Sequence, residues 1–107
     1  MRNASDYYKT ERCFYPTSPN LMLMQNLDRL TSFDAFAYLD TFSPRPLLFI
    51  VGSLANTHYF SQDAFDRAVE PKEMFVVEGA KHVDLYDGPQ YVSQALNKLT
   101  EFFDKVL

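Results

Sequence analysis

A continuous apolar run at residues 47–51 (LLFIV) constrains the fold of this chain more than any other feature. The run lies between Pro46 and Gly52, and it holds no polar residue, which is typical of a strand buried on both faces of a parallel sheet. A second apolar run follows at residues 74–77 (MFVV). Because parallel strands need a crossover connection, we expect a helix between the two runs and a right-handed path.

Apolar residues at helical spacing predict three helices around these strands. The first covers residues 26–40 and ends before the Ser43-Pro44 step, because proline pushes the residue before it out of the helical region. The crossover helix covers residues 61–69, with Ser61 as its cap. The last covers residues 89–106. The sequence therefore predicts an α/β fold with parallel strands at about 46–52 and 73–78, preceded at residues 1–25 by an irregular or short helical segment.

Length, charge and hydropathy limit the classes of function. With 107 residues, the chain makes one domain at most. Its net charge is −4 and its basic residues are scattered, so it has no basic stripe for a nucleic acid. The apolar runs are far shorter than the roughly 20 residues of a membrane helix, and the N-terminus lacks a signal pattern. We expect a cytoplasmic protein with no nucleic-acid or membrane partner.

Residues that commonly bind metals are sparse. Cys13 is the only cysteine, so neither an internal disulfide nor a cysteine metal site can form within one chain. His58 and His82 lie 24 positions apart, which is not a ligand spacing on one helix. The sequence therefore predicts no metal and no cofactor.

The residues that follow the two strands are the candidates for chemistry. In open α/β sheets, ligands and catalytic groups gather in the loops beyond the carboxyl ends of the strands, here residues 53–60 and 79–88. His82 lies in the second loop. A free imidazole titrates near pH ~6.5, which suits a general base that takes a proton from a hydroxyl nucleophile. The alternative is a loop histidine that only binds its neighbours.

Five segments of the sequence carry a resemblance: residues 43–48 (SPRPLL), 59–64 (YFSQDA), 70–73 (EPKE), 79–87 (GAKHVDLYD) and 98–103 (KLTEFF). With them, the chain is similar, from about Tyr7 to its end, to the C-terminal part of microbial α/β-hydrolases related to dienelactone hydrolases. That resemblance implies a serine hydrolase acting on ester or related acyl substrates, with His82 as the general base of the triad. It also implies a cap-like segment at residues 1–25 and the C-terminal part of the hydrolase domain at residues 26–107.

The nucleophile of this family is absent from the chain. These enzymes carry their serine in a G-x-S-x-G elbow that precedes the acid and the histidine, and the sequence has no such motif. Ser53 follows Gly52 without the second half of an elbow, so it reads as a strand-end turn residue; Ser5, Ser18 and Ser61 read as turn or cap residues. We therefore expect a hydrolase fragment that is inactive alone.

The third member of the triad stays open between Asn56 and Asp63. No acid follows the first strand directly; Asn56 can orient an imidazole through its amide oxygen but cannot stabilise the imidazolium as a carboxylate does. Asp63 is the nearest carboxylate, in the first turn of the expected crossover helix. Asp84 and Asp87 are expected to bind backbone amides near His82. His58 is expected to be an ordinary exposed histidine.

Three interpretations of the whole chain follow. The first is the hydrolase fragment, whose open sheet edge predicts a homo-oligomer or association with a missing N-terminal half. The second is a non-catalytic interaction or ligand-binding domain that reuses the hydrolase scaffold. The third is an unrelated small α/β fold, which antiparallel pairing of residues 47–51 with 74–77 would favour.

Overall fold

The computed structural model describes residues 2–107, with side chains from residue 4 onward. The chain forms two compact units, Met1–Ala37 and Tyr38–Leu107. The first unit therefore extends beyond the cap-like segment expected at residues 1–25. Both strands and the loops that follow them belong to the second unit.

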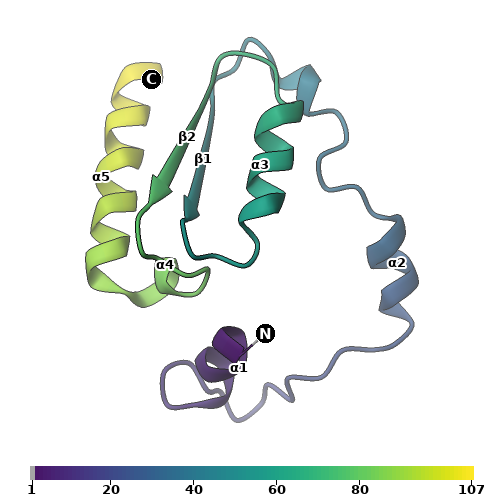
Figure 1. Cartoon of the computed structure of the whole chain (residues 1–107). Coiled ribbons are helices and arrows are strands. Elements are labelled where there is room, and N and C mark those ends of the chain that lie inside the picture. The colour runs from purple at the N-terminus through teal and green to yellow at the C-terminus, as the bar shows by residue number, and fades with distance from the viewer. Residues whose placement is uncertain (1) are drawn as a thin grey trace. The chain divides into compact units, whose positions relative to one another are not determined.

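A parallel pair of strands forms the centre of the second unit. β1 (Leu47–Gly52) and β2 (Lys72–Val77) pair along their full length, first residue with first and last with last. The predicted strands and their parallel pairing are confirmed, and the antiparallel pairing of an unrelated fold is not found. α3 (His58–Arg67) makes the crossover between the strands, and α5 (Pro89–Val106) follows β2. Figure 1 shows these two helices on opposite sides of the strand pair.

The core of the second unit is small and consists mainly of alanine and valine. Val77 at the end of β2 is completely buried, as is Ala80 just after it. Next to this core, the ring of Phe49 on β1 meets the ring of Phe65 on α3 edge to face, with centroids 5.9 Å apart. The buried apolar residues of this unit are Val51, Ala55, Ala64, Ala68, Val77, Ala80 and Val83.

Two lysines attach the helices to β2. The ammonium group of Lys72 donates to the carbonyl of Phe65 at 2.7 Å and to that of Ala68 at 2.9 Å, which are acceptors left open at the end of α3. On α5, the side chain of Lys98 is only 12% exposed and forms an ion pair with Glu73 of β2. Each of the two helices therefore has a lysine-mediated polar contact with β2.

The helix predicted at residues 26–40 is too long. α2 (Asn26–Ser32) ends earlier because the carboxylate of Asp34 accepts the backbone N–H of Phe36 at 2.9 Å, a local turn that competes with helix formation. Tyr38 then takes the left-handed conformation, with φ 66°, before the short 3-10 helix η1 (Leu39–Phe42). The spacing of apolar residues in the sequence does not predict turns that a polar side chain such as that of Asp34 stabilises.

The other two helices agree better with the sequence. α5 has the predicted bounds, with Pro89 at its first position. The crossover helix begins three residues before the prediction, so Ser61 lies inside α3 and not at its cap. Thr57 occupies the cap position, yet its side chain makes no capping hydrogen bond. The hydroxyl of Thr57 lies instead within hydrogen-bonding distance of the His82 ring.

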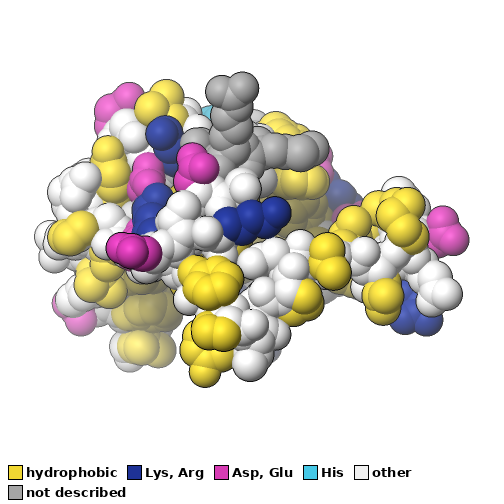
Figure 2. All heavy atoms as spheres, turned by 90° about the horizontal axis from the view of Figure 1, so that it is seen from below, with side chains coloured by type: hydrophobic (Ala, Val, Ile, Leu, Met, Phe, Trp, Pro, Cys, Tyr) yellow, Lys and Arg dark blue, Asp and Glu magenta, His cyan; other side chains and the backbone are white. Residues whose placement is uncertain are grey.

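The first unit leaves most of its apolar side chains exposed. It contains α1 (Arg2–Lys9), where Tyr7 is buried and packs edge to face on Tyr8 with centroids 4.9 Å apart. Leu21 is 84% exposed, and Figure 2 shows hydrophobic side chains on the surface of the segment that carries α2, at the right. In the described part of the chain, no helix is long and apolar enough to cross a membrane.

Candidate active site

The two strands end at the same edge of the sheet, and His82 lies in the loop beyond that edge. After β2, the chain turns through Gly79, whose φ of 75° is the left-handed conformation that glycine adopts without strain. His82 follows in a turn just before the short helix α4 (Asp84–Asp87), and it is exposed. This is the position, beyond the carboxyl end of a parallel strand, where α/β proteins place catalytic groups.

Hydrogen bonds join the loop after β1 to the loop after β2. The hydroxyl of Ser53 donates to the carboxylate of Glu78 at 3.1 Å and accepts the backbone N–H of Gly79 at 2.8 Å. The backbone N–H of Leu54 donates to the carbonyl of Ala80 at 3.0 Å. Ser53 therefore has the structural role at the strand end that its sequence position predicts. These bonds fix the His82 loop against the strand that precedes α3.

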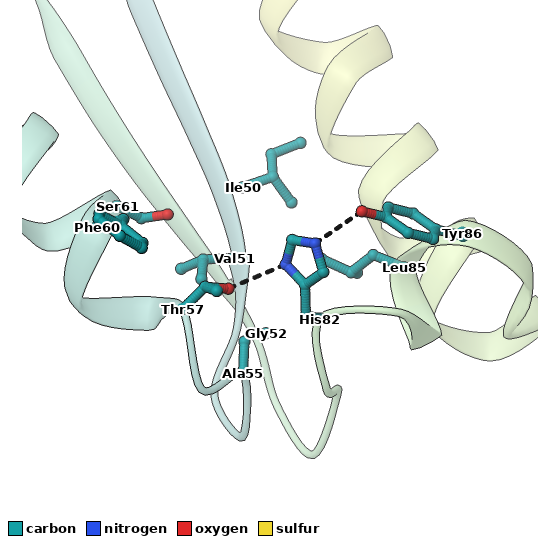
Figure 3. Close-up of a pocket in the computed structure, with 10 residues that line it drawn as sticks. All are labelled: Ile50, Val51, Gly52, Ala55, Thr57, Phe60, Ser61, His82, Leu85 and Tyr86. Carbon is teal, nitrogen blue, oxygen red and sulfur yellow. Dashed lines mark hydrogen bonds between the residues drawn. The ribbon is translucent and has the colours of Figure 1, made fainter. Parts of the chain in front are cut away.

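Both nitrogens of the His82 ring lie next to hydroxyl groups. The Thr57 Oγ1 atom is 2.9 Å from Nδ1, and the Tyr86 hydroxyl is 2.7 Å from Nε2. Figure 3 shows these two hydroxyls on opposite sides of the imidazole. The ring planes of His82 and Tyr86 meet edge to face at 77°, with centroids 5.4 Å apart. Contacts on both sides hold the ring in one orientation.

A cavity of about 350 Å³ opens beside the imidazole. This volume falls within the range of about 300–1,000 Å³ typical of small-molecule sites. The wall is mainly apolar, and its polar side chains are hydroxyls and the imidazole itself, as Figure 3 shows. Such a site has the size and the mainly apolar lining of a small-molecule site. The lining residues are Ile50, Val51, Gly52, Ala55, Thr57, Phe60, Ser61, His82, Leu85 and Tyr86.

The structure does not bring Asn56 or Asp63 to the imidazole. Asn56 is exposed in the loop between β1 and α3, and among the described residues it makes no hydrogen bond to His82. Asp63 forms an ion pair with Arg67 one turn along α3, at 3.5 Å, and its side chain is 56% exposed. The partner of Nδ1 is Thr57, which sequence reasoning missed because it searched this loop for a carboxylate or an amide.

The structure also shows the contacts of two other residues that the sequence analysis considered, Asp84 and His58. The carboxylate of Asp84 accepts the backbone N–H of Lys81 at 3.0 Å, the structural role expected for it. The prediction that His58 is exposed is wrong, since it begins α3 and is half-buried, and its Nε2 is a buried atom without a hydrogen-bond partner. Within residues 2–107, no group of three or more His, Cys, Asp or Glu side chains is placed to hold a metal ion.

Two bacterial proteins named as uncharacterized are similar to this chain. The chain is 37% identical over 108 residues to the uncharacterized protein YcjY of Escherichia coli (strain K12), and 38% identical over 105 residues to the uncharacterized protein PA2218 of Pseudomonas aeruginosa. It also resembles the crystal structure of the latter hypothetical protein with a TM-score of 0.87 and 36% identity. No family model matches the chain.

The chain spans about a third of the length of these relatives. The matches cover 100% and 95% of this chain, but 35% and 28% of the two proteins, and the structural match covers 99% of this chain and 33% of the other. The relatives therefore contain long segments with no counterpart in these 107 residues.

Proposed function

We propose that this chain is the C-terminal part of a serine-type α/β-hydrolase, which carries the histidine base and acts on ester or related acyl compounds. The observation that carries the proposal is the place of His82, exposed beyond the carboxyl end of β2 and facing a mainly apolar cavity of about 350 Å³. Parallel pairing of the two strands supports it, because antiparallel strands would not put both loops at one edge.

In the proposed reaction, His82 exchanges protons with two other groups. Its Nε2 takes the proton of a serine hydroxyl as the serine oxygen attacks the acyl carbon, and it then gives that proton to the departing alcohol. Water repeats the sequence to release the acid and restore the serine. The 107 residues supply no G-x-S-x-G serine, so the nucleophile belongs to another segment or chain. The isolated chain is accordingly inactive toward esters.

A chimera tests the missing half. In it, this chain replaces the aligned segment of the E. coli relative, which spans 108 residues. We expect a fluorophosphonate probe to label a serine of the chimera and not to label the isolated chain, because only the chimera unites a nucleophile with His82. Gel fluorescence and mass spectrometry of the labelled peptide measure the result.

The intact E. coli relative is the control for this experiment. Labelling of the relative together with no labelling of the chimera would mean that the chain does not supply the base. If neither protein reacts with the probe, the serine mechanism itself is contradicted. Labelling of the isolated chain would place a reactive serine within residues that we interpret as structural.

The edges of the sheet predict association. Within the described residues, β1 and β2 form a sheet of only two strands, so each strand has one edge without a strand neighbour. Two-stranded sheets are marginal alone, and open edges pair with other chains. We expect the isolated chain to form dimers or larger species that grow with concentration, measured by size-exclusion chromatography with light scattering. A monomer at every concentration would contradict this.

A non-catalytic binding domain is the second candidate, and one observation favours it. The nitrogen that must act as the base already binds a hydroxyl of the same chain, that of Tyr86 at 2.7 Å. A protein that uses the cavity only to bind a small molecule needs neither a free Nε2 nor a serine. The chimera distinguishes the two candidates, since a binding domain leaves the probe unreacted while the cavity still takes up ligand.

A further inference from the structure

We infer that Thr57 is the positioning residue of His82, which it fixes as the tautomer with hydrogen on Nδ1, and that the Tyr86 hydroxyl occupies the place of the nucleophile at Nε2. The first part concerns this chain by itself. The second part rests on the proposed function, because only a hydrolase requires a serine hydroxyl at that nitrogen.

The capping position of Thr57 shows what its hydroxyl is used for. Threonine before a helix ordinarily accepts a backbone N–H of the first turn, and this capping bond is worth about 1 kcal/mol. At the start of α3, Thr57 makes no such bond, and its Oγ1 lies instead 2.9 Å from Nδ1 of His82. The side chain therefore stabilises the orientation of the imidazole and not the helix.

The chemistry of the two hydroxyls decides the tautomer. A phenol is a stronger hydrogen-bond donor than an aliphatic alcohol, and its oxygen is a weaker acceptor because the ring withdraws its lone pairs. Tyr86 therefore donates to Nε2, and Nδ1–H donates to Thr57. This arrangement leaves the basic lone pair on Nε2, as a histidine that deprotonates a hydroxyl requires. Thr57 thus does the orienting work of the triad acid without its negative charge.

The position of Tyr86 allows its hydroxyl to leave Nε2 of His82. It lies on α4, one helical turn after His82, and it is 49% exposed, so its ring has open space on one side. An entering serine hydroxyl would make the same hydrogen bond to Nε2 that the phenol makes now. In the assembled enzyme the entering serine hydroxyl therefore takes the place of the phenol at Nε2.

Nitrogen NMR of the isolated chain tests the tautomer. Long-range proton–nitrogen spectra at about pH 8.5, above the ordinary titration range of imidazole, report which ring nitrogen carries the hydrogen. We expect hydrogen on Nδ1 in the parent and in Thr57→Ser, and a shift toward hydrogen on Nε2 in Thr57→Val. Ser61→Ala is the matched control, because it removes a hydroxyl from the same cavity without touching the ring.

Two results would overturn the positioning role. One is a parent spectrum with the hydrogen mainly on Nε2, and the other is a Thr57→Val spectrum identical to that of the parent. Misfolding is not expected to obscure the comparison, because valine removes no capping bond from α3. Thr57→Ser keeps the hydroxyl, so its spectrum separates the loss of the hydrogen bond from a change in packing.

Kinetics of the chimera test the second part. Misorientation of a base is expected to cost about 100-fold in kcat, so Thr57→Val should lower kcat by that factor and leave KM nearly unchanged, while Thr57→Ser restores the rate. Tyr86→Phe should raise kcat, because it removes the hydroxyl that competes with the serine for Nε2; an unchanged or lowered kcat would overturn the displacement. If the chimera is inactive while the isolated 107-residue chain shows the expected tautomers, the proposed hydrolase function is contradicted. The positioning role of Thr57 then still stands.

Discussion

Replacing His82 with glutamine in the chimera is expected to lower ester hydrolysis by about 1,000-fold to 10,000-fold. General acid–base catalysis contributes factors of this size, and glutamine keeps a polar side chain of similar length without a group that titrates near neutral pH. The substitution affects an exposed side chain whose hydrogen bonds, among the described residues, go to Thr57 and Tyr86, so the fold should tolerate it. Initial rates with a chromogenic short-chain ester measure the effect.

His58→Gln is the matched control for this experiment. It makes the same chemical change at the other histidine, which begins α3 and does not line the cavity. We expect the rate of this variant to stay close to that of the parent chimera. Equal losses at both positions would mean that glutamine acts through the fold, and an unchanged rate in His82→Gln would remove His82 from the reaction.

The parts of the fold that follow from local patterns were predictable. Residues 47–51 and 74–77 are apolar without interruption, which is typical of neighbouring strands of a parallel sheet with a crossover between them. The prediction that the first run is buried on both faces is wrong, because only Val51 and Gly52 of β1 are buried in this two-stranded sheet. The bounds of α5 follow from Pro89 and an apolar stripe that repeats at helical spacing. The extent of α2 was not predictable in this way, because a single turn at Asp34 ends the helix within an otherwise helical pattern.

The site was only half predictable from the sequence. His82 stands out because it follows a strand at a short distance, and this is a local property of the chain. Its partner Thr57 is 25 residues away in the sequence, and the contact exists only because the two strands end at one edge. The sequence left the partner open between Asn56, which is adjacent to Thr57, and Asp63. Which residue of a loop faces an imidazole depends on backbone geometry that composition does not reveal.

The absence of a side chain at Gly52 matters both for the stability of the fold and for the geometry of the site. A Cβ atom at this position would lie 2.2 Å from the carbonyl oxygen of Ala80, a distance that real Cβ atoms do not show. The carbonyl has little freedom to move, because it accepts the N–H of Leu54 at 3.0 Å, and Ala80 itself is completely buried. Its position also fixes the loop on which His82 lies two residues later.

Gly52→Ala is therefore expected to destabilise the chain by about 3 kcal/mol, the upper part of the range for overpacked cores and more than 100-fold in the folding equilibrium. Urea unfolding followed by circular dichroism measures the change.

Gly79→Ala is the control for this prediction. The left-handed φ of 75° at Gly79 costs a residue with a side chain about 1 kcal/mol, while the atom nearest to the added Cβ is 3.6 Å away. A larger loss for Gly79→Ala would mean that backbone strain, and not the close approach of the two loops, limits stability here. If Gly52→Ala keeps the stability of the parent, the strands do not meet the His82 loop as closely as described, and the bond from Thr57 to the imidazole loses its structural basis.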